Sequence, residues 1–366
     1  MPPAAAGSRP APATTASPLL VEVTRGDRVE SRHRGTVAVA GTDGTLLAHL
    51  GDPDEPVFLR SSAKAFQLAP FITSGHFDAY GFPDAVPTMA VMAASHAGED
   101  RHVRLVQSAL RAGGLTRDAL QCGTHTPFDQ ETAQRLARDG EPPSELRHNC
   151  SGKHAAMALF ARAAGWEVET YWQPDHPVQR AALETVAAVS GVRKGRIQTA
   201  TDGCGVVSFA LPLLAIARMY AVLADPSGLK DEVLANALTR IRDAMLAHPE
   251  LISGDRRQFD TDLMRAAPGR LVAKGGAEGL RCVGVLPGGV EAGSKAIGVA
   301  VKIEDGDAAR RAGPAATCEA LRQLGALGEV ELTQLESYAH PTVLDLSRGE
   351  PVGDVQPAFE LERDAV

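Results

Sequence analysis

The lysines of this chain stand out, because the sequence uses arginine as its ordinary cation. It contains 7 lysines and 30 arginines. Three of the lysines lie beside serine, cysteine or glycine clusters: Lys64 in RSSAKAFQ, Lys153 in HNCSGKHAA and Lys274 in VAKGGAEG. A buried ammonium can lose its proton, whereas a guanidinium cannot. Any one of these positions could be chance, but together they indicate lysine-dependent chemistry.

Ser61 and Lys64 form an S-x-x-K pattern ahead of an apolar helical run. Residues three apart share one face of a helix, so we expect the Ser61 hydroxyl and the Lys64 amine to meet. A desolvated lysine can take the proton of a serine and make it a nucleophile. The pattern alone is common, and its ordinary interpretation is a helix cap beside a surface lysine.

Two later segments strengthen the catalytic interpretation. Serine hydrolases with S-x-x-K add a second serine segment and a lysine in a late K-T-G-like turn. Ser95 follows about thirty residues after the pattern, and Lys274 begins Lys-Gly-Gly at the end of an expected strand. Gly275 departs from the pattern, since it replaces a hydroxyl residue. The order still predicts an acyl-transfer site.

Two cysteines and their neighbours suggest a metal site. Cys150 and Lys153 form C-x-x-K, and Cys204 lies in a TDGCG turn. Two thiolates and a neutral nitrogen would leave one tetrahedral zinc position open. By residue type His154 is the expected nitrogen donor, because lysine must first lose its proton. The alternative is a pair of buried structural cysteines.

Composition restricts the partners and the compartment. The net charge of -8, with a pI near 5.8 and 4% aromatic residues, argues against nucleic acid and anionic membranes as partners. Five scattered cysteines and a start without an export signal predict free thiols in the cytoplasm. The most apolar stretch, residues 206–224, is interrupted by polar residues and proline, which favours a buried helix over a membrane span.

The elements expected to position these residues are strands at both chain ends and helices between them. This order predicts an α/β (mixed α+β) fold, with an antiparallel sheet built from both ends and a helical middle lobe. We expect a disordered tail at 1–17, a single catalytic unit at 18–345 (sheet from about 18–60 and 268–305, helical lobe about 61–267) and a C-terminal segment of turn and tail at 346–366. The expected strands are 20–23, 35–40, 45–50, 270–273, 280–286 and 296–303, and the clearest helices are 99–112, 177–189 and 229–247.

Taken together, these motifs resemble the rhizobial-type zinc-binding L-asparaginases of the asparaginase II family. The resemblance covers about residues 20–345, and its most specific motif is NCSGKHAAM. The segments that carry it are RSSAKAFQ, ASHAGE, NCSGKHAAM, DGCG and KGGAEG, in the order of the family. Ala65, Ala97 and Gly275 depart from the expected pattern, but none of them removes a reactive group.

The resemblance implies a serine β-lactamase or penicillin-binding-protein fold and hydrolysis of L-asparagine to L-aspartate and ammonia. It implies homodimers and a zinc ion that organises loops rather than performing the chemistry. The implied catalytic residues are Ser61 as nucleophile with Lys64, and Ser95 with Lys274 as a second Ser–Lys pair; the implied zinc ligands are Cys150, Lys153 and Cys204; the implied substrate-binding residues are Arg60, His154 and Asp202.

Alternatives remain at this point. The two lysines could exchange their roles as base and acid. The same fold could carry a β-lactamase-like or esterase-like serine hydrolase, although the expected cytoplasmic location speaks against extracellular substrates. A catalytically silent protein that binds an amino acid or zinc is the third possibility, but it would have no use for two Ser–Lys pairs.

Overall fold

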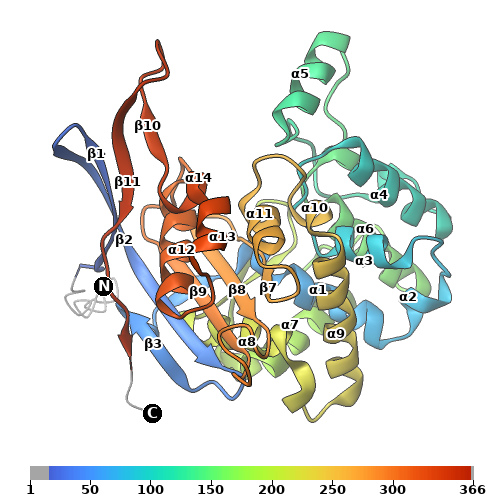
Figure 1. Ribbon diagram of the computed structural model, residues 1–366. Helices are drawn as coiled ribbons and strands as arrows, with labels where there is room; N and C mark the ends of the chain where they lie inside the picture. The colour runs from blue at the N-terminus through green and yellow to red at the C-terminus, as the bar shows by residue number, and fades with distance from the viewer. Residues whose placement is uncertain (1–15, 364–366) are drawn as a thin grey trace, which may run out of the picture.

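A computed structural model describes residues 16–363 of the protein, which form a large sheet beside a lobe of helices (Figure 1). The expected mixed fold, with an antiparallel sheet from both chain ends and a helical middle, is confirmed. The strands are β1 Leu19–Arg25, β2 Arg28–Gly41, β3 Leu46–Leu50, β4 Pro56–Phe58, β5 Gln198–Thr201, β6 Val207–Pro212, β7 Leu271–Ala273, β8 Leu280–Val285, β9 Ile297–Ile303, β10 Thr342–Leu344, β11 Pro351–Pro357 and β12 Glu362–Arg363.

The large sheet has the order β10-β11-β1-β2-β9-β8-β7, with β3 pairing with β2 and β12 with β3. β2 is the link between the chain ends: it pairs antiparallel with β1 and β3 from the start and with β9 from the late part of the chain. Its last residues are buried, as a strand covered on both faces requires. This sheet holds β7, whose end carries Lys274, at its far edge.

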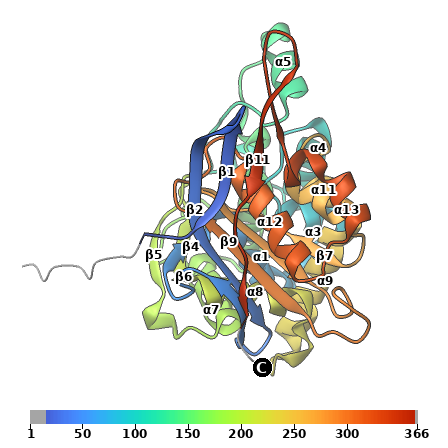
Figure 2. The ribbon, with the colours of Figure 1, turned by 60° about the vertical axis from the view of Figure 1, so that its left-hand side comes forward.

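Helices cover both faces of the sheet, and further helices form the lobe beside it (Figures 1 and 2). α8 packs against β9, β2 and β8, and α12 packs against β9, β11 and β1. The helices are α1 Lys64–Thr73, α2 His76–Ala79, α3 Ala85–Met92, α4 Asp100–Ala112, α5 Gln130–Asp139, α6 Ser151–Ala163, α7 Pro177–Ser190, α8 Leu213–Ala224, α9 Glu232–Ala247, α10 Pro249–Ile252, α11 Phe259–Ala266, α12 Ala312–Gln323, α13 Glu329–Gln334 and α14 Glu336–Ala339.

The lobe also contains a small antiparallel sheet of order β4-β6-β5. The helix expected over residues 206–224 is therefore wrong in its first half, where β6 runs to Pro212 before α8 begins. The residues of β6 before Pro212 are all buried, so the segment shows no alternation of buried and exposed positions that would indicate a strand. None of the helices between residues 16 and 363 is both long and apolar enough to span a bilayer.

The C-terminal residues, expected to be turn and tail, instead complete the sheet. β11 pairs with β10 and β1, for example Val23 with Val355, and β12 pairs with β3. Pro351 and Gly353 gave this segment the appearance of a turn, but proline is tolerated at the start of a strand. Of the expected tail at 1–17, residues 1–15 lie outside the described part of the chain.

Candidate active site

The S-x-x-K segment forms a tight bend between β4 and α1. Arg60–Ala63 is a single 3-10 turn, and Arg60 enters it with φ of 49°, a left-handed conformation that is costly for a residue with a side chain. The bend separates the two serines. Ser62 is fully buried and its hydroxyl donates to the carbonyl of Lys274 at 3.1 Å, whereas Ser61 lines the main pocket. Ser61 is therefore the serine within reach of a ligand.

Lys64 lies at the start of α1, completely buried. Its Nζ donates to the carbonyl oxygens of Ala94 and Asn149, at 2.5 and 3.2 Å, and lies 2.8 Å from Ser95 Oγ. Burial lowers the pKa of this ammonium below its usual value, partly opposed by the charge of Cys150. A neutral amine here can donate its two protons to the two carbonyls and direct its lone pair at the Ser95 hydroxyl.

Lys274 is the second buried lysine, at the end of β7. Its Nζ donates to the carbonyl of Gly275 at 2.7 Å and lies 4.0 Å from Oδ2 of Asp260. Burial lowers its pKa to about 7, while the carboxylate of Asp260 raises it and the charge of Lys64 lowers it further. This lysine can therefore gain or lose a proton near neutral pH.

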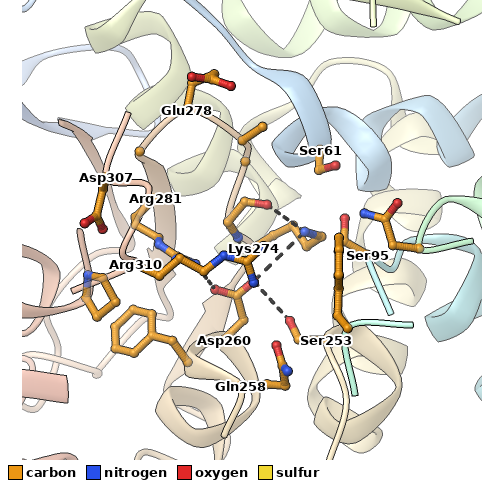
Figure 3. A pocket seen from close by; sticks show the side chains of 18 of the residues that line it. Ser61, Ser95, Ser253, Gln258, Asp260, Lys274, Glu278, Arg281, Asp307 and Arg310 are labelled. Atoms are coloured by element: carbon orange, nitrogen blue, oxygen red, sulfur yellow. Dashed lines mark hydrogen bonds and ion pairs between the residues drawn. The ribbon is translucent and has the colours of Figure 1, made fainter. Parts of the chain in front are cut away.

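The pairing of serines with lysines differs from the sequence-based expectation. Lys64 bonds to Ser95 rather than to Ser61, and among residues 16–363 the Ser61 hydroxyl has no hydrogen-bond partner. The second expected pair, Ser95 with Lys274, makes no hydrogen bond in this part of the chain either. Both residues nevertheless line the same pocket as Ser61 (Figure 3). Ser61, Ser95 and Lys274 thus share one pocket, and Lys64 is joined to them through Ser95.

The pocket has a volume of about 400 Å³ and lies between the sheet edge and the helical lobe. Ser61 and Ser95 lie on one side, Lys274 lies between the walls, and Arg310 and Asp307 lie on the other side (Figure 3). Non-glycine residues with positive φ gather around it. The five such residues in the described chain are Arg60, Arg257, Glu278, Asp307 and Arg310, and all but Arg60 line the pocket. Strain of this kind, about 1–3 kcal/mol for each residue, is typical of functional sites.

The residues predicted to hold the substrate amino acid lie outside the pocket lining. Arg60 Nε donates to Asp202 Oδ1 at 2.6 Å, which joins two of them into an ion pair. Burial raises the pKa of Asp202, but Lys153 and Arg60 lower it below its usual value. His154 is fully buried, with Nδ1 2.6 Å from the hydroxyl of Tyr171 and no hydrogen-bond partner for Nε2 among the described residues.

The three predicted metal ligands lie together in the interior. Cys150 and Cys204 are buried, and Lys153 Nζ donates to Cys204 Sγ at 3.0 Å. A hydrogen bond from the Cys204 thiol lowers the pKa of Cys150 well below its ordinary value. Burial alone lowers the pKa of Lys153, but the two sulfur atoms and Asp202 raise it above its ordinary value. Within residues 16–363 no group of three His, Cys, Asp or Glu side chains could hold a metal, so this set depends on the lysine nitrogen.

Asp260 is the functional candidate that the sequence did not reveal. Its buried carboxylate accepts from the backbone N–H of Gly275 at 2.7 Å and from the Ser253 hydroxyl at 3.2 Å, and it lies 3.4 Å from Arg281. Burial raises its pKa, but Lys274 and Arg281 lower it below the usual value. Asp260 therefore fixes the turn that carries Lys274 and sets the charge beside it.

Two further residues around Lys64 were also missed. His96 Nε2 lies 2.9 Å from Ser151 Oγ, and burial lowers the pKa of His96 well below its usual value, so the ring is neutral. Asn149 contributes a backbone oxygen to Lys64 and lines the pocket. Asn149 and Ser151 flank Cys150 in the cysteine motif, so the motif itself was the available signal.

The mixed α/β fold thus places Ser61, Ser95 and Lys274 around one pocket, with Lys64 bonded to Ser95. Several solved structures match the chain. A probable glutaminase from Bacillus subtilis, complexed with 6-diazo-5-oxo-L-norleucine, is 13% identical over 79% of this chain and 84% of its own, with a TM-score of 0.38. A β-lactamase from Burkholderia ambifaria is 17% identical over 79% of this chain and 95% of its own, with a TM-score of 0.37.

The family model of L-asparaginase II matches residues 21–357. The chain therefore belongs to the L-asparaginase II family, whose activity is hydrolysis of an amide. No curated protein matches the chain. The match extends to the end of β11, in agreement with the place of that strand in the sheet.

Proposed function

We propose that this protein is an L-asparaginase that hydrolyses the side-chain amide of L-asparagine to L-aspartate and ammonia, with Ser61 as the nucleophile. The observation that carries the proposal is the meeting of Ser61, Ser95 and Lys274 at one pocket, with buried Lys64 bonded to Ser95, in a member of the L-asparaginase II family. Burial lowers the pKa of both lysines, to about 7 for Lys274, which favours the neutral amines that acid–base catalysis requires.

In the first step, the Ser61 oxygen attacks the amide carbon and loses its proton. Lys64 in its neutral form is the base, and its hydrogen bond to Ser95 supports a relay in which Ser95 passes the proton between Ser61 and Lys64. The carbon–nitrogen bond breaks, and the departing nitrogen takes up the proton that Lys64 accepted and leaves as ammonia. An aspartyl ester of Ser61 remains.

In the second step, water attacks the ester, and Ser61 regains its proton as L-aspartate leaves. Lys274, protonated below a pH of about 7, faces this region beside Asp260 and stabilises negative charge that develops at the reacting carbonyl. We therefore assign the base role to Lys64 and the cationic role to Lys274. The reverse assignment predicts the opposite pH dependence.

The amino-acid end of the substrate is assigned to Arg60 and Asp202. A guanidinium binds a carboxylate and a carboxylate binds an ammonium, so this pair matches the two charges of an amino acid. Arg60 directly precedes Ser61, which keeps the amino-acid end close to the nucleophile. His154 is fully buried with its Nδ1 against the hydroxyl of Tyr171, which favours a supporting role over direct contact with the substrate.

The residues fit a zinc ion of the kind that the rhizobial-type resemblance implies. Two buried thiols and a lysine nitrogen supply three donors of the types that zinc accepts, provided that Lys153 gives up its proton. When bound, the ion would supply a fixed positive charge that holds Cys150, Lys153 and Cys204 together. The ion would also hold the turn that carries Asp202 in place, because Asp202 lies two residues before Cys204. A homodimer in the cytoplasm remains part of the same proposal.

Ammonia release from L-asparagine by the purified protein tests the proposal, with Ser61→Ala and Ser74→Ala compared side by side. Ser74 lies exposed at the other end of α1, so its substitution controls for the loss of a hydroxyl. We expect activity in the wild type and in Ser74→Ala and none in Ser61→Ala. Activity that survives in Ser61→Ala would assign the nucleophile to another residue. Absence of ammonia in the zinc-supplied wild type would reject the asparaginase proposal.

A further inference from the structure

The pocket beside Ser61 is much larger than the leaving group of asparagine requires. Ammonia is about the size of a water molecule, which occupies about 30 Å³ of liquid. The pocket measures about 400 Å³, and neither Arg60 nor Asp202, the residues assigned to the amino-acid end, is among its lining residues. With the amino-acid end assigned to Arg60 and Asp202, this space is left for the group on the amide nitrogen.

The far wall of this space carries charges with no partners among the described residues. Arg257 and Arg310 are exposed and form no ion pair within residues 16–363, and Arg310 lies over the ring of Phe128 at 5.1 Å. Arg281 is already paired with Asp260. Glu278 is the one exposed lining carboxylate, because Asp307 and Asp260 are buried, so the exposed charges of the wall sum to a positive value.

The backbone of this wall is held in a costly conformation. Arg257, Arg310, Glu278 and Asp307 all have positive φ, between 48° and 57°. Asp307 is buried and its carboxylate accepts from the backbone N–H groups of Ala312 and Gly313, which anchors the loop before α12. A loop fixed in this way presents Arg310 toward the pocket, opposite Ser61 and Ser95 (Figure 3).

We propose that the enzyme also cleaves asparagine derivatives whose amide nitrogen carries a carboxylate-bearing group, that is, linear β-aspartyl peptides. The proposal rests on the asparaginase function and extends it on the leaving-group side. Ser61 attacks the same carbonyl carbon, the bond to the substituted nitrogen breaks, and the nitrogen takes up one proton and leaves as an amino acid. Water then releases L-aspartate from the ester. Arg257 and Arg310 bind the carboxylate of the departing amino acid.

The test compares three substrates: L-asparagine, β-aspartylglycine and β-aspartylglycinamide. The last two differ only in the carboxylate. Released ammonia or amine is quantified for each with the purified full-length protein. We expect cleavage of β-aspartylglycine, with a kcat/KM about tenfold above that of the glycinamide, which is the scale of one charged hydrogen bond. Ser61→Ala removes all three activities, since one nucleophile serves them.

Variants assign the effect to the pocket wall. The double variant R257A/R310A lowers the ratio of kcat/KM for β-aspartylglycine to that for asparagine about tenfold, and R257K/R310K restores part of it. Arg111→Ala, an exposed arginine of α4, leaves the ratio unchanged. Cleavage of asparagine without cleavage of β-aspartylglycine overturns this inference and leaves the asparaginase function intact. An equal loss for both substrates in the double variant also overturns it, because the arginines would then bind the part that the substrates share.

Discussion

Replacement of Asp260 by asparagine changes the charge beside Lys274 with little change in shape. The carboxylate lies 4.0 Å from Lys274 Nζ and accepts a hydrogen bond from the N–H of Gly275 at 2.7 Å. Asparagine keeps an acceptor oxygen for that N–H. The negative charge of Asp260 favours the ammonium form of Lys274, so its removal lowers the pKa of Lys274 from about 7.

The size of the effect follows from the distance. Two unit charges about 4 Å apart interact by about 4 kcal/mol at an effective dielectric constant of about 20. One pKa unit corresponds to about 1.4 kcal/mol, so the full interaction would shift the titration by about 3 pH units. Water that enters beside the uncharged side chain screens this interaction, so we expect a shift of about 2 pH units. The charge of Arg281, which Asp260 no longer neutralises, acts in the same downward direction.

The assay is the pH dependence of kcat/KM for L-asparagine, which reports groups of the free enzyme. If Lys274 acts as a cation, wild-type activity falls as the pH rises through about 7, and in Asp260→Asn the same fall occurs at lower pH. Asp78→Asn is the matched control, since Asp78 is a distant surface carboxylate paired with Arg240. Thermal unfolding of both variants separates a titration effect from loss of structure.

Two results would refute this reasoning. If the pH at which kcat/KM falls is unchanged or higher in Asp260→Asn, the carboxylate does not set the pKa of Lys274. A wild-type activity that rises through about pH 7 and rises earlier in the variant would keep the electrostatics but exchange the roles of the two lysines.

Three further predictions concern the metal, the packing and the stability. Cys150→Ser lowers the zinc content of protein purified with zinc, measured by plasma mass spectrometry, whereas Cys122→Ser does not; equal contents would reject the site. Gly298→Ala lowers the free energy of unfolding by about 3 kcal/mol, because the added Cβ would lie 1.8 Å from a backbone oxygen of α8. Denaturant titration measures this loss, and Gly195→Ala, whose added Cβ would meet open space, leaves the free energy of unfolding nearly unchanged. Because the pKa of Lys274 is lowered from 10.5 to about 7 on folding, the unfolded state binds more protons in this window, and the unfolding free energy rises with pH there. Lys274→Met flattens that rise, and an unchanged slope would contradict it.

The fold was largely predictable because its strands alternate with clear turn signals. The Gly41–Gly44 hairpin and the three late strands lie where the pattern put them, and so do α4, α7 and α9 within a few residues. Residues 206–212 could not be assigned to a strand, since a strand buried on both faces has no alternation to detect. β11 was missed because its proline and glycine resemble a turn until the pairing with β1 is known.

The site was predictable in residue types but not in its contacts. The motifs predicted Ser61, Lys64, Ser95 and Lys274 as site residues, yet spacing within one helix predicted Ser61, and not Ser95, as the hydrogen-bond partner of Lys64. Its actual partner lies 31 residues away, and only the packing of α3 against α1 and α6 brings it near. Asp260 had no motif to distinguish it from the other 44 acidic residues. Its role depends on the hydrogen bond from the turn at Gly275 to Asp260 in α11, a contact between segments that no sequence pattern marks.

The most direct test of the account is the identity of the residue that carries the acyl group. Acid quenching during turnover of L-asparagine, followed by digestion and mass spectrometry, locates an aspartyl ester on the protein. The account predicts the ester on the peptide that contains Ser61, and its absence in Ser61→Ala. An ester on Ser95 or Cys150, or ammonia released in a burst with no ester on any residue, would contradict it.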